Sequence, residues 1–156
     1  MTGLYNRMGY QKLSISYFTI MREKKMPVLV MFIDLDRLKY INDTFGHEYG
    51  DFAIVSIAKA MLKHCDADAI AARTGGDEFI VLEGAKDEES GRVLAQKIRT
   101  ELSKTQRAMQ LPFDLSASIG AVVAHPGEEN VLESYVKRAE MLMYEEKAEK
   151  KVSRDS

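Results

Sequence analysis

Residues 28–36 read Val-Leu-Val-Met-Phe-Ile-Asp-Leu-Asp, an uninterrupted apolar run that leads into two aspartates. Such a run is typical of a strand that is buried on both faces of a sheet. Pro27 precedes it and ends the helical pattern upstream. A carboxylate at the end of a buried strand is costly unless it binds a cation or accepts hydrogen bonds. Asp34 is therefore a candidate functional group, with capping of the next helix as the alternative.

The patterns on either side of this strand predict the remaining elements. Helical periodicity predicts helices over residues 4–25, 37–45, 51–63, 88–103 and 131–149. Strands are predicted over 69–74, 79–83 and 113–123. The first two form a tight hairpin. Residues 46–50 are predicted to form a loop. The helix residues predicted to face the core are Leu13, Tyr17, Ile20, Met21, Phe52, Val55, Leu62, Val93, Leu94, Ile98, Leu102, Leu132, Tyr135, Val136, Ala139 and Met143. This order predicts an α+β fold in which one antiparallel sheet is layered with helices. The sequence does not decide whether a further small strand pair forms near 83–85 or 105–111.

Composition excludes several classes of protein. With 156 residues the chain has the size of one domain, and its net charge of −2 argues against a nucleic-acid binder. The single cysteine, Cys65, excludes an internal disulfide, and we expect an inert, partly buried thiol there. The longest apolar run is too short to span a bilayer, and no signal peptide is evident. We expect a cytoplasmic domain without membrane contact of its own, although the parent protein could be membrane-anchored.

The predicted hairpin places an acidic pair at its tip, in Gly75-Gly76-Asp77-Glu78. If the first strand lies beside this hairpin, Asp34, Asp77 and Glu78 converge. Three hard oxygen donors suit magnesium or manganese, and such ions suit phosphoryl transfer. The alternative is an ordinary solvated turn. The glycines could bring the backbone close to a phosphate or could simply provide positive φ angles in a hairpin.

Four further polar residues follow the first strand, and each has two interpretations. Lys39 could face a phosphate or be a solvated lysine. Asn42 and Asp51 could read the edge of a guanine base, or they could end one helix and cap the next. His47 could touch a ligand or tie down a glycine-rich loop.

Taken together, these residues give the chain a resemblance to the GGDEF family of diguanylate cyclases over nearly its whole length. Several separated motifs occur in the family's order, which makes chance agreement very improbable. The segments that carry the resemblance are 2–7 (TGLYNR), 32–43 (FIDLDRLKYIND), 46–51 (GHEYGD), 73–79 (RTGGDEF), 118–120 (SIG) and, in the last predicted helix, Ala139, Glu140, Tyr144 and Lys147.

The resemblance implies a polymerase-palm-like fold with a ferredoxin-like core, a central antiparallel sheet of about five strands flanked by helices. It implies a metal-dependent condensation of two GTP into cyclic di-GMP and two pyrophosphates. Two Mg²⁺ or Mn²⁺ ions per active half-site would be held by Asp34, the carbonyl of Leu35, Asp77 and Glu78. Asp77, Glu78 and Lys39 would act in catalysis.

The same resemblance implies how substrate is held. The residues that would bind GTP are Asn42, His47, Asp51, Gly75, Gly76, Lys147 and Lys151. Each subunit would hold one GTP, and two subunits would meet face to face, so that turnover requires a homodimer. Nucleic acid is not an expected partner.

The chain also departs from the family pattern. Asp66 and Ala69 occupy the arginine and aspartate places of the product-inhibition motif R-x-x-D, so we expect no feedback inhibition through that site. Lys151 stands where an arginine usually supports the γ-phosphate. We expect one catalytic domain over 1–151, a frayed tail over 152–156, and sensor domains upstream in the parent protein. The alternative function is a catalytically silent GTP-binding module that regulates an attached domain.

Overall fold

The structure is a computed structural model that describes residues 2–128 and 131–155. The elements are α1 (Arg7–Glu23), β1 (Val28–Leu35), α2 (Leu38–Phe45), α3 (His47–His64), β2 (Ile70–Arg73), β3 (Glu78–Gly84), α4 (Ser90–Ala108), β4 (Ala117–Ala124) and α5 (Leu132–Asp155). Their order is the predicted one, and the α+β fold with an antiparallel sheet is confirmed.

The sheet has the strand order β2-β3-β1-β4, and every neighbouring pair is antiparallel. β1 is an interior strand, so the apolar run of residues 28–33 pairs along both edges and is buried throughout. The prediction of about five strands is wrong, since the described residues form four. Residues 105–108 continue α4, and residues 83–84 end β3.

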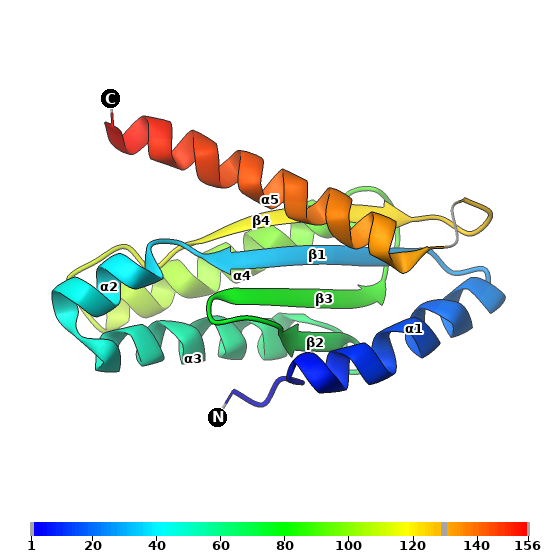
Figure 1. Cartoon of the computed structure of the whole chain (residues 1–156), viewed down its shortest axis with the longest axis horizontal. Coiled ribbons are helices and arrows are strands. Elements are labelled where there is room, and N and C mark those ends of the chain that lie inside the picture. The colour runs from blue at the N-terminus through cyan, green and yellow to red at the C-terminus, as the bar shows by residue number, and fades with distance from the viewer. Residues whose placement is uncertain (1, 129–130, 156) are drawn as a thin grey trace.

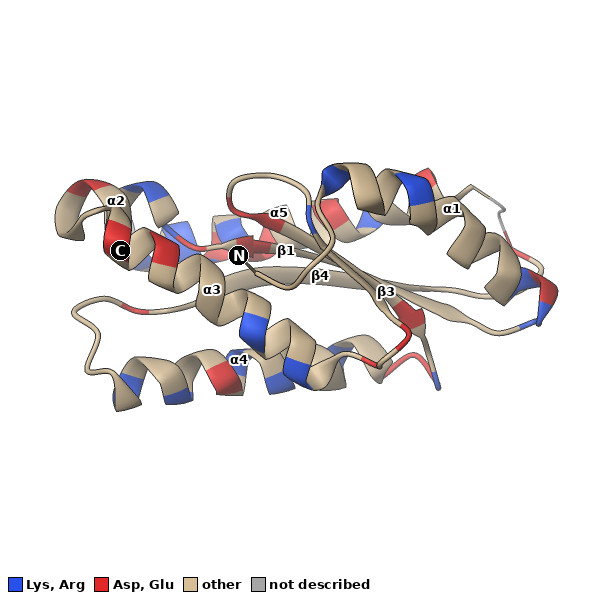
Figure 2. Ribbon diagram, turned by 90° about the horizontal axis from the view of Figure 1, so that it is seen from below, with Lys and Arg blue, Asp and Glu red and all other residues tan. Residues whose placement is uncertain are grey.

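Helices cover both faces of the sheet (Figures 1 and 2). On one face α3 and α4 pack against the β1 side chains of Leu29, Met31 and Ile33. On the other face α1 and α5 pack against Val30 and Phe32. Figure 2 shows the strands tan over most of their length, with the charged residues mainly on helices and loops. This burial of alternate side chains on both faces explains why β1 has no polar residue before Asp34.

The predicted loop over residues 46–50 is wrong, because α3 begins at His47 rather than at residue 51. Only Gly46, with φ of +102°, separates α2 from α3. A single glycine with positive φ is enough to turn the chain between two helices. The predicted apolar face of this helix is also wrong: Leu62 is exposed, and the fully buried side chains include Ile57 and Met61.

The first helix is shorter than the predicted range 4–25. Its N-cap is Asn6, whose side-chain oxygen accepts a hydrogen bond from Gly9 N at 2.8 Å. Tyr5 instead pairs with Ala72 in an isolated parallel bridge beside β2. At the other end Lys25 adopts a positive φ of 58°, which terminates the helical conformation.

Within the helices, periodicity identified only part of each buried face. The residues predicted as core that are exposed are Leu13, Ile20, Leu62 and Val93. Phe18 of α1 is buried beside Tyr135 of α5, with ring centroids 5.9 Å apart. The predicted inward residues Leu132, Tyr135, Ala139 and Met143 of α5 are buried.

The last strand and helix also differ from their predicted bounds. β4 begins at Ala117 rather than at residue 113, and residues 113–116 form the irregular approach to it. α5 continues to Asp155, beyond residue 149 where the predicted helix ends, and Ser156 lies outside the described residues. Lys150, within this extension, forms an ion pair with Asp36 and thereby holds the final turns against the sheet.

Candidate functional site

The site lies where β1 ends. Asp34 and Asp36 occupy alternate positions, so both side chains point to the face covered by α5. Each is only 5% exposed. Two buried carboxylates require compensating donors or cations, and the neighbouring elements supply them.

The turn between β2 and β3 brings the other acidic residues to Asp34. Asp34 is the register partner of Glu78, and Leu35 N donates a hydrogen bond to Asp77 O at 2.9 Å. Carboxylate oxygens of Asp34, Asp77 and Glu78 all lie within 4.8 Å of one another. The predicted convergence of these three residues is therefore present in the structure.

Burial and mutual repulsion perturb this cluster. Burial, followed by the negative charge of Asp77, raises the pKa of Asp34 to about 6, although Lys147 acts in the opposite direction. Burial and the charge of Asp77 also raise the pKa of Glu78. A divalent cation would relieve this repulsion, and oxygen donors are the ligands that magnesium and manganese prefer. The donor set thus fits the metal that the family resemblance implies.

Two lysines of α5 meet the two aspartates. Lys147 Nζ lies 2.8 Å from Asp34 Oδ1 and 3.4 Å from Leu35 O. The contact with Asp34 is an ion pair rather than a well-directed hydrogen bond. Lys150 Nζ lies 2.6 Å from Asp36 Oδ2 and donates to Ala117 O at 2.8 Å. Both cations therefore contact polar oxygens at the β1 end of the sheet.

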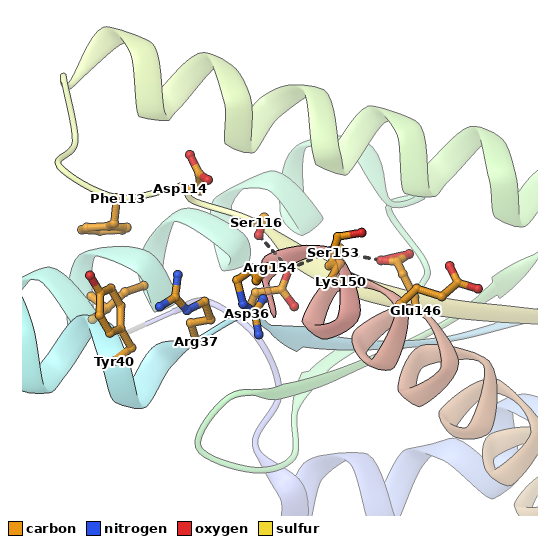
Figure 3. A pocket seen from close by; sticks show the side chains of 12 residues that line it. Asp36, Arg37, Tyr40, Phe113, Asp114, Ser116, Glu146, Lys150, Ser153 and Arg154 are labelled. Atoms are coloured by element: carbon orange, nitrogen blue, oxygen red, sulfur yellow. Dashed lines mark hydrogen bonds and ion pairs between the residues drawn. The ribbon is translucent and has the colours of Figure 1, made fainter. Parts of the chain in front are cut away.

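Asp36 is the centre of a network that sequence reasoning missed. Besides Lys150, it accepts hydrogen bonds from the hydroxyls of Ser116 and Ser118, each at 2.7 Å. Figure 3 shows Asp36, Ser116 and Lys150 at the wall of one cavity. Although burial acts to raise the pKa of Asp36, these donors hold it below its usual value. The only sequence signal for this network is the second acid in Asp-Leu-Asp.

The hairpin is held by an arginine whose role was also missed. Arg73 donates from Nε to Gly75 O at 3.2 Å and from a terminal nitrogen to Gly76 O at 2.7 Å. Neither glycine has a positive φ, so the conformational reason proposed for them is wrong. A Cβ on Gly75 would lie 3.1 Å from Glu78 Oε2, whereas one on Gly76 would meet nothing within 4 Å. A side chain at residue 75 would therefore press on the Glu78 carboxylate.

The residues expected to read guanine lie on α2 and α3. Asn42 rests against Gly50, where a Cβ would come within 1.7 Å of the Asn42 amide oxygen. His47 and Asp51 are exposed on the first two turns of α3. The short connection at Gly46 thus places Asn42, His47 and Asp51 at the junction of α2 and α3, called the α2–α3 corner below.

Two lysines predicted as site residues take different positions. Lys39 is exposed and pairs with Asp43 of its own helix at 3.2 Å, so the structure does not bring it to the carboxylate cluster. Lys151 lines a cavity of about 450 Å³ together with Lys147 and Arg37. Arg37, in the left-handed conformation with φ of 57°, is the N-cap residue of α2 and follows Asp36 directly.

Among the described residues, none of the helices combines the length and the apolar character that crossing a membrane would require.

The profile of the family described as "Diguanylate cyclase, GGDEF domain" matches residues 1–153. The chain belongs to the GGDEF family. This membership supports diguanylate cyclase activity, and it agrees with the acidic hairpin tip facing Asp34.

Curated relatives and solved structures agree with this assignment. The chain is 33% identical to "Diguanylate cyclase VdcA" of Vibrio cholerae over 94% of its length and 43% of the relative's. It is 35% identical to "Probable diguanylate cyclase DgcT" of Escherichia coli, over 80% of this chain and 28% of that one. The GGDEF domain of YfiN (TpbB) from Pseudomonas aeruginosa has 29% identity and a TM-score of 0.79, covering 95% of this chain and 87% of that domain. The chain thus spans less than half the length of these two curated relatives.

Proposed function

We propose that this GGDEF domain condenses two molecules of GTP into cyclic di-GMP and two pyrophosphates. The observation that carries the proposal is the convergence of the Asp34, Asp77 and Glu78 oxygens within 4.8 Å. Two relatives that match most of the chain bear the name diguanylate cyclase, which supports the same reaction.

The residues at the end of β1 would hold the ions. Asp34, Asp77, Glu78 and the Leu35 carbonyl would bind two Mg²⁺ or Mn²⁺ ions. When bound, these ions would stabilise the negative charge that develops on the reacting phosphate. Lys147 already contacts Asp34 and Leu35 O, so its ammonium can move from these oxygens to a phosphate.

The chain's own side chains position the substrate and move the proton. In the reaction the ribose 3′-oxygen bonds to the α-phosphorus of the other GTP, the bond from this phosphorus to pyrophosphate breaks, and the hydroxyl proton passes to Asp77 or Glu78. The raised pKa of Glu78 suits a group that must accept a proton. Gly75 and Gly76 would let the nucleotide approach the backbone, and Lys151 would offset phosphate charge.

The α2–α3 corner would recognise the base. The Asp51 carboxylate would accept hydrogen bonds from guanine N–H groups, the Asn42 amide would bind the remaining edge, and His47 would lie beside them. We assign Lys39 an auxiliary role toward phosphate, for which it would have to leave Asp43. Asp66 and Ala69 replace the inhibitory arginine and aspartate, and we propose that product does not inhibit through that surface.

Incubation of the full chain with GTP and magnesium chloride, with products identified by mass spectrometry, tests the proposal. We expect cyclic di-GMP and pyrophosphate from the wild type and at least about a hundredfold less product from Asp34→Asn, because a metal-binding carboxylate is lost. Asp68→Asn is the matched control, since Asp68 is an exposed aspartate outside the cluster, and it should remain active.

The competing function, a silent GTP-binding module, predicts a different result. In that case the wild type would bind GTP but form no cyclic di-GMP, even when dimerisation is forced. The intact set of three carboxylates favours the cyclase, since binding alone does not require all of them.

A further inference from the structure

Helices α4 and α5 lie on opposite faces of the sheet, and an ion pair joins them beside the edge strand β4. α4 contributes Ile98 to the core of one face, whereas α5 contributes Met143 to the core of the other. The Arg99 guanidinium of α4 pairs with the Glu146 carboxylate of α5. Within the described parts of the chain, this is the single ion pair between these two helices.

Glu146 connects this contact to the end of β1. Its carboxylate also pairs with Lys150 at 3.2 Å, one helical turn further along α5. Lys150 in turn lies 2.6 Å from Asp36 and donates to Ala117 O at 2.8 Å. Figure 3 shows Lys150 between Glu146 and Asp36. Arg99, Glu146, Lys150 and Asp36 thus form a network of alternating charges, called the α4–α5 network below.

The inner members of the α4–α5 network are shielded from water. Side-chain exposure rises outward from the sheet, from 6% at Asp36 and 22% at Glu146 to 32% at Lys150 and 40% at Arg99. Water and salt screen shielded pairs less than exposed ones. The network therefore restrains the final turns of α5 more firmly than an isolated surface pair would.

This restraint fixes α5 on both sides of Lys147. On one side, Met143 N would lie only 2.5 Å from a Cβ built on Gly120 of β4, so the helix backbone and the strand are in close contact there. On the other side, Lys150 contacts Asp36. Lys147 lies between these two points and reaches Asp34 at 2.8 Å. A helix held only near Met143 could tilt about that point, and the α4–α5 network prevents such a tilt.

We propose that Arg99 is a positioning residue that acts through Glu146 and Lys150. It holds α5 in the orientation that presents Lys147 to the nucleotide. The role of Lys147 toward the nucleotide rests on the proposed function. Arg99 lies on α4 and pairs with Glu146 rather than with the carboxylate cluster, so its influence on the site passes through α5.

Calorimetric titration of the full chain with the α,β-methylene analogue of GTP, in magnesium chloride, tests this role without turnover. We expect Arg99→Gln to weaken binding about threefold to fivefold, the range of one partly exposed ion pair. Arg99→Lys keeps the charge and should weaken binding by less than about twofold. Arg92→Gln is the matched control, because Arg92 also lies on α4 but pairs with Glu89, three residues earlier, and should leave the affinity unchanged.

A double-mutant cycle with Lys147→Gln separates positioning from a general loss of stability. If Arg99 acts through Lys147, Arg99→Gln should change the affinity by less than about 1.5-fold once Lys147 has been replaced. An Arg99→Gln effect of the same size in both backgrounds would overturn the assignment, because independent effects add.

Hydrogen exchange measured without nucleotide supplies a readout that does not depend on the cyclase reaction. Peptides from residues 146–155 should exchange about threefold faster in Arg99→Gln and at the wild-type rate in Arg92→Gln. Unchanged exchange or unchanged affinity in Arg99→Gln would contradict the proposal, as would an equal loss of affinity in Arg92→Gln or a wild type that does not bind the analogue. Absence of cyclic di-GMP from a wild type that binds the analogue refutes only the cyclase.

Discussion

At the end of β1, two aspartates separated by one residue face two lysines separated by two residues on α5. Lys147 contacts Asp34, and Lys150 contacts Asp36. Two residues of strand span about 6.6 Å and three residues of helix about 4.5 Å, so flexible lysine side chains can match both spacings. The Asp36 pair has additional serine donors, whereas Asp34 faces the acidic hairpin. One pair therefore joins α5 to the sheet through a saturated network, and the other borders the carboxylate cluster.

Cys65, the C-cap residue of α3, allows a test of burial at the residue scale. Burial, reinforced by the charges of Glu83 and Asp66, raises the pKa of its thiol to about 12. The thiol is then almost entirely protonated at pH 8, and we expect it to react with a disulfide reagent at least about a hundredfold more slowly than in the unfolded chain. The rate is measured from absorbance with and without urea.

The direction of the pH dependence follows from the raised pKa of Cys65. The folded protein retains the thiol proton while the unfolded chain loses it above about pH 8.5, so this group lowers the free energy of unfolding as pH rises from there toward 12. Since Cys65 is the only cysteine, the reagent reports on this residue alone. Equal rates for folded and unfolded protein would show that the thiol is not shielded.

At the element scale, the position of α5 depends on its close approach to β4. A Cβ built on Gly120 would lie 2.0 Å from Ala139 O and 2.5 Å from Met143 N, both backbone atoms of α5. These backbone atoms cannot move away from an added Cβ without moving the whole helix, whereas a flexible side chain could. Glycine at this position is therefore what lets the helix that carries Lys147 rest on the sheet.

We expect Gly120→Ala to lower the free energy of unfolding by about 2–3 kcal/mol, because overpacking must push α5 away from β4. Urea denaturation measures the change, with the slope against denaturant expected to stay constant. Gly76→Ala is the control for stability, since a Cβ there meets nothing within 4 Å. A fully stable Gly120→Ala would mean that α5 does not pack as closely as the structure shows.

At the scale of the whole molecule, the proposed reaction joins two nucleotides although each subunit is proposed to bind one. The carboxylate cluster is at the tip of a hairpin, where Asp77 and Glu78 are partly exposed and can face a second subunit. The negative charge of Asp77 and Glu78 on the two facing surfaces must be offset by bound metal cations. Catalysis then depends on encounter between two subunits.

We expect the rate of cyclic di-GMP formation to rise more steeply than linearly with protein concentration, because the proposed reaction needs two subunits to meet. Fusion of a dimeric coiled coil to the N-terminus should raise activity at low concentration, as measured by product mass and sedimentation. The same fusion carrying Asp77→Ala serves as the inactive control. A strictly linear rate together with a monomeric sedimentation profile would contradict the two-subunit mechanism.

Much of the fold and the centre of the site follow from the sequence. A continuous apolar run indicates a central strand, and periodicity gives the order of the helices and strands. The ordered motifs, including Asp34 and Asp77-Glu78, are sufficient to indicate the family and the carboxylate cluster. These features are local, because each depends on residue types at fixed short spacing.

Only the tertiary structure decides which charges meet and which helical faces are buried. Lys147 contacts the Leu35 carbonyl from 112 residues away, and no spacing rule predicts such a contact. The start of α3 depends on a single glycine angle, and the buried face of that helix depends on where α4 and β1 lie. Arg154 lines the same cavity as Lys147 because α5 continues to Asp155. Sequence determines the chemical groups, whereas packing determines their partners.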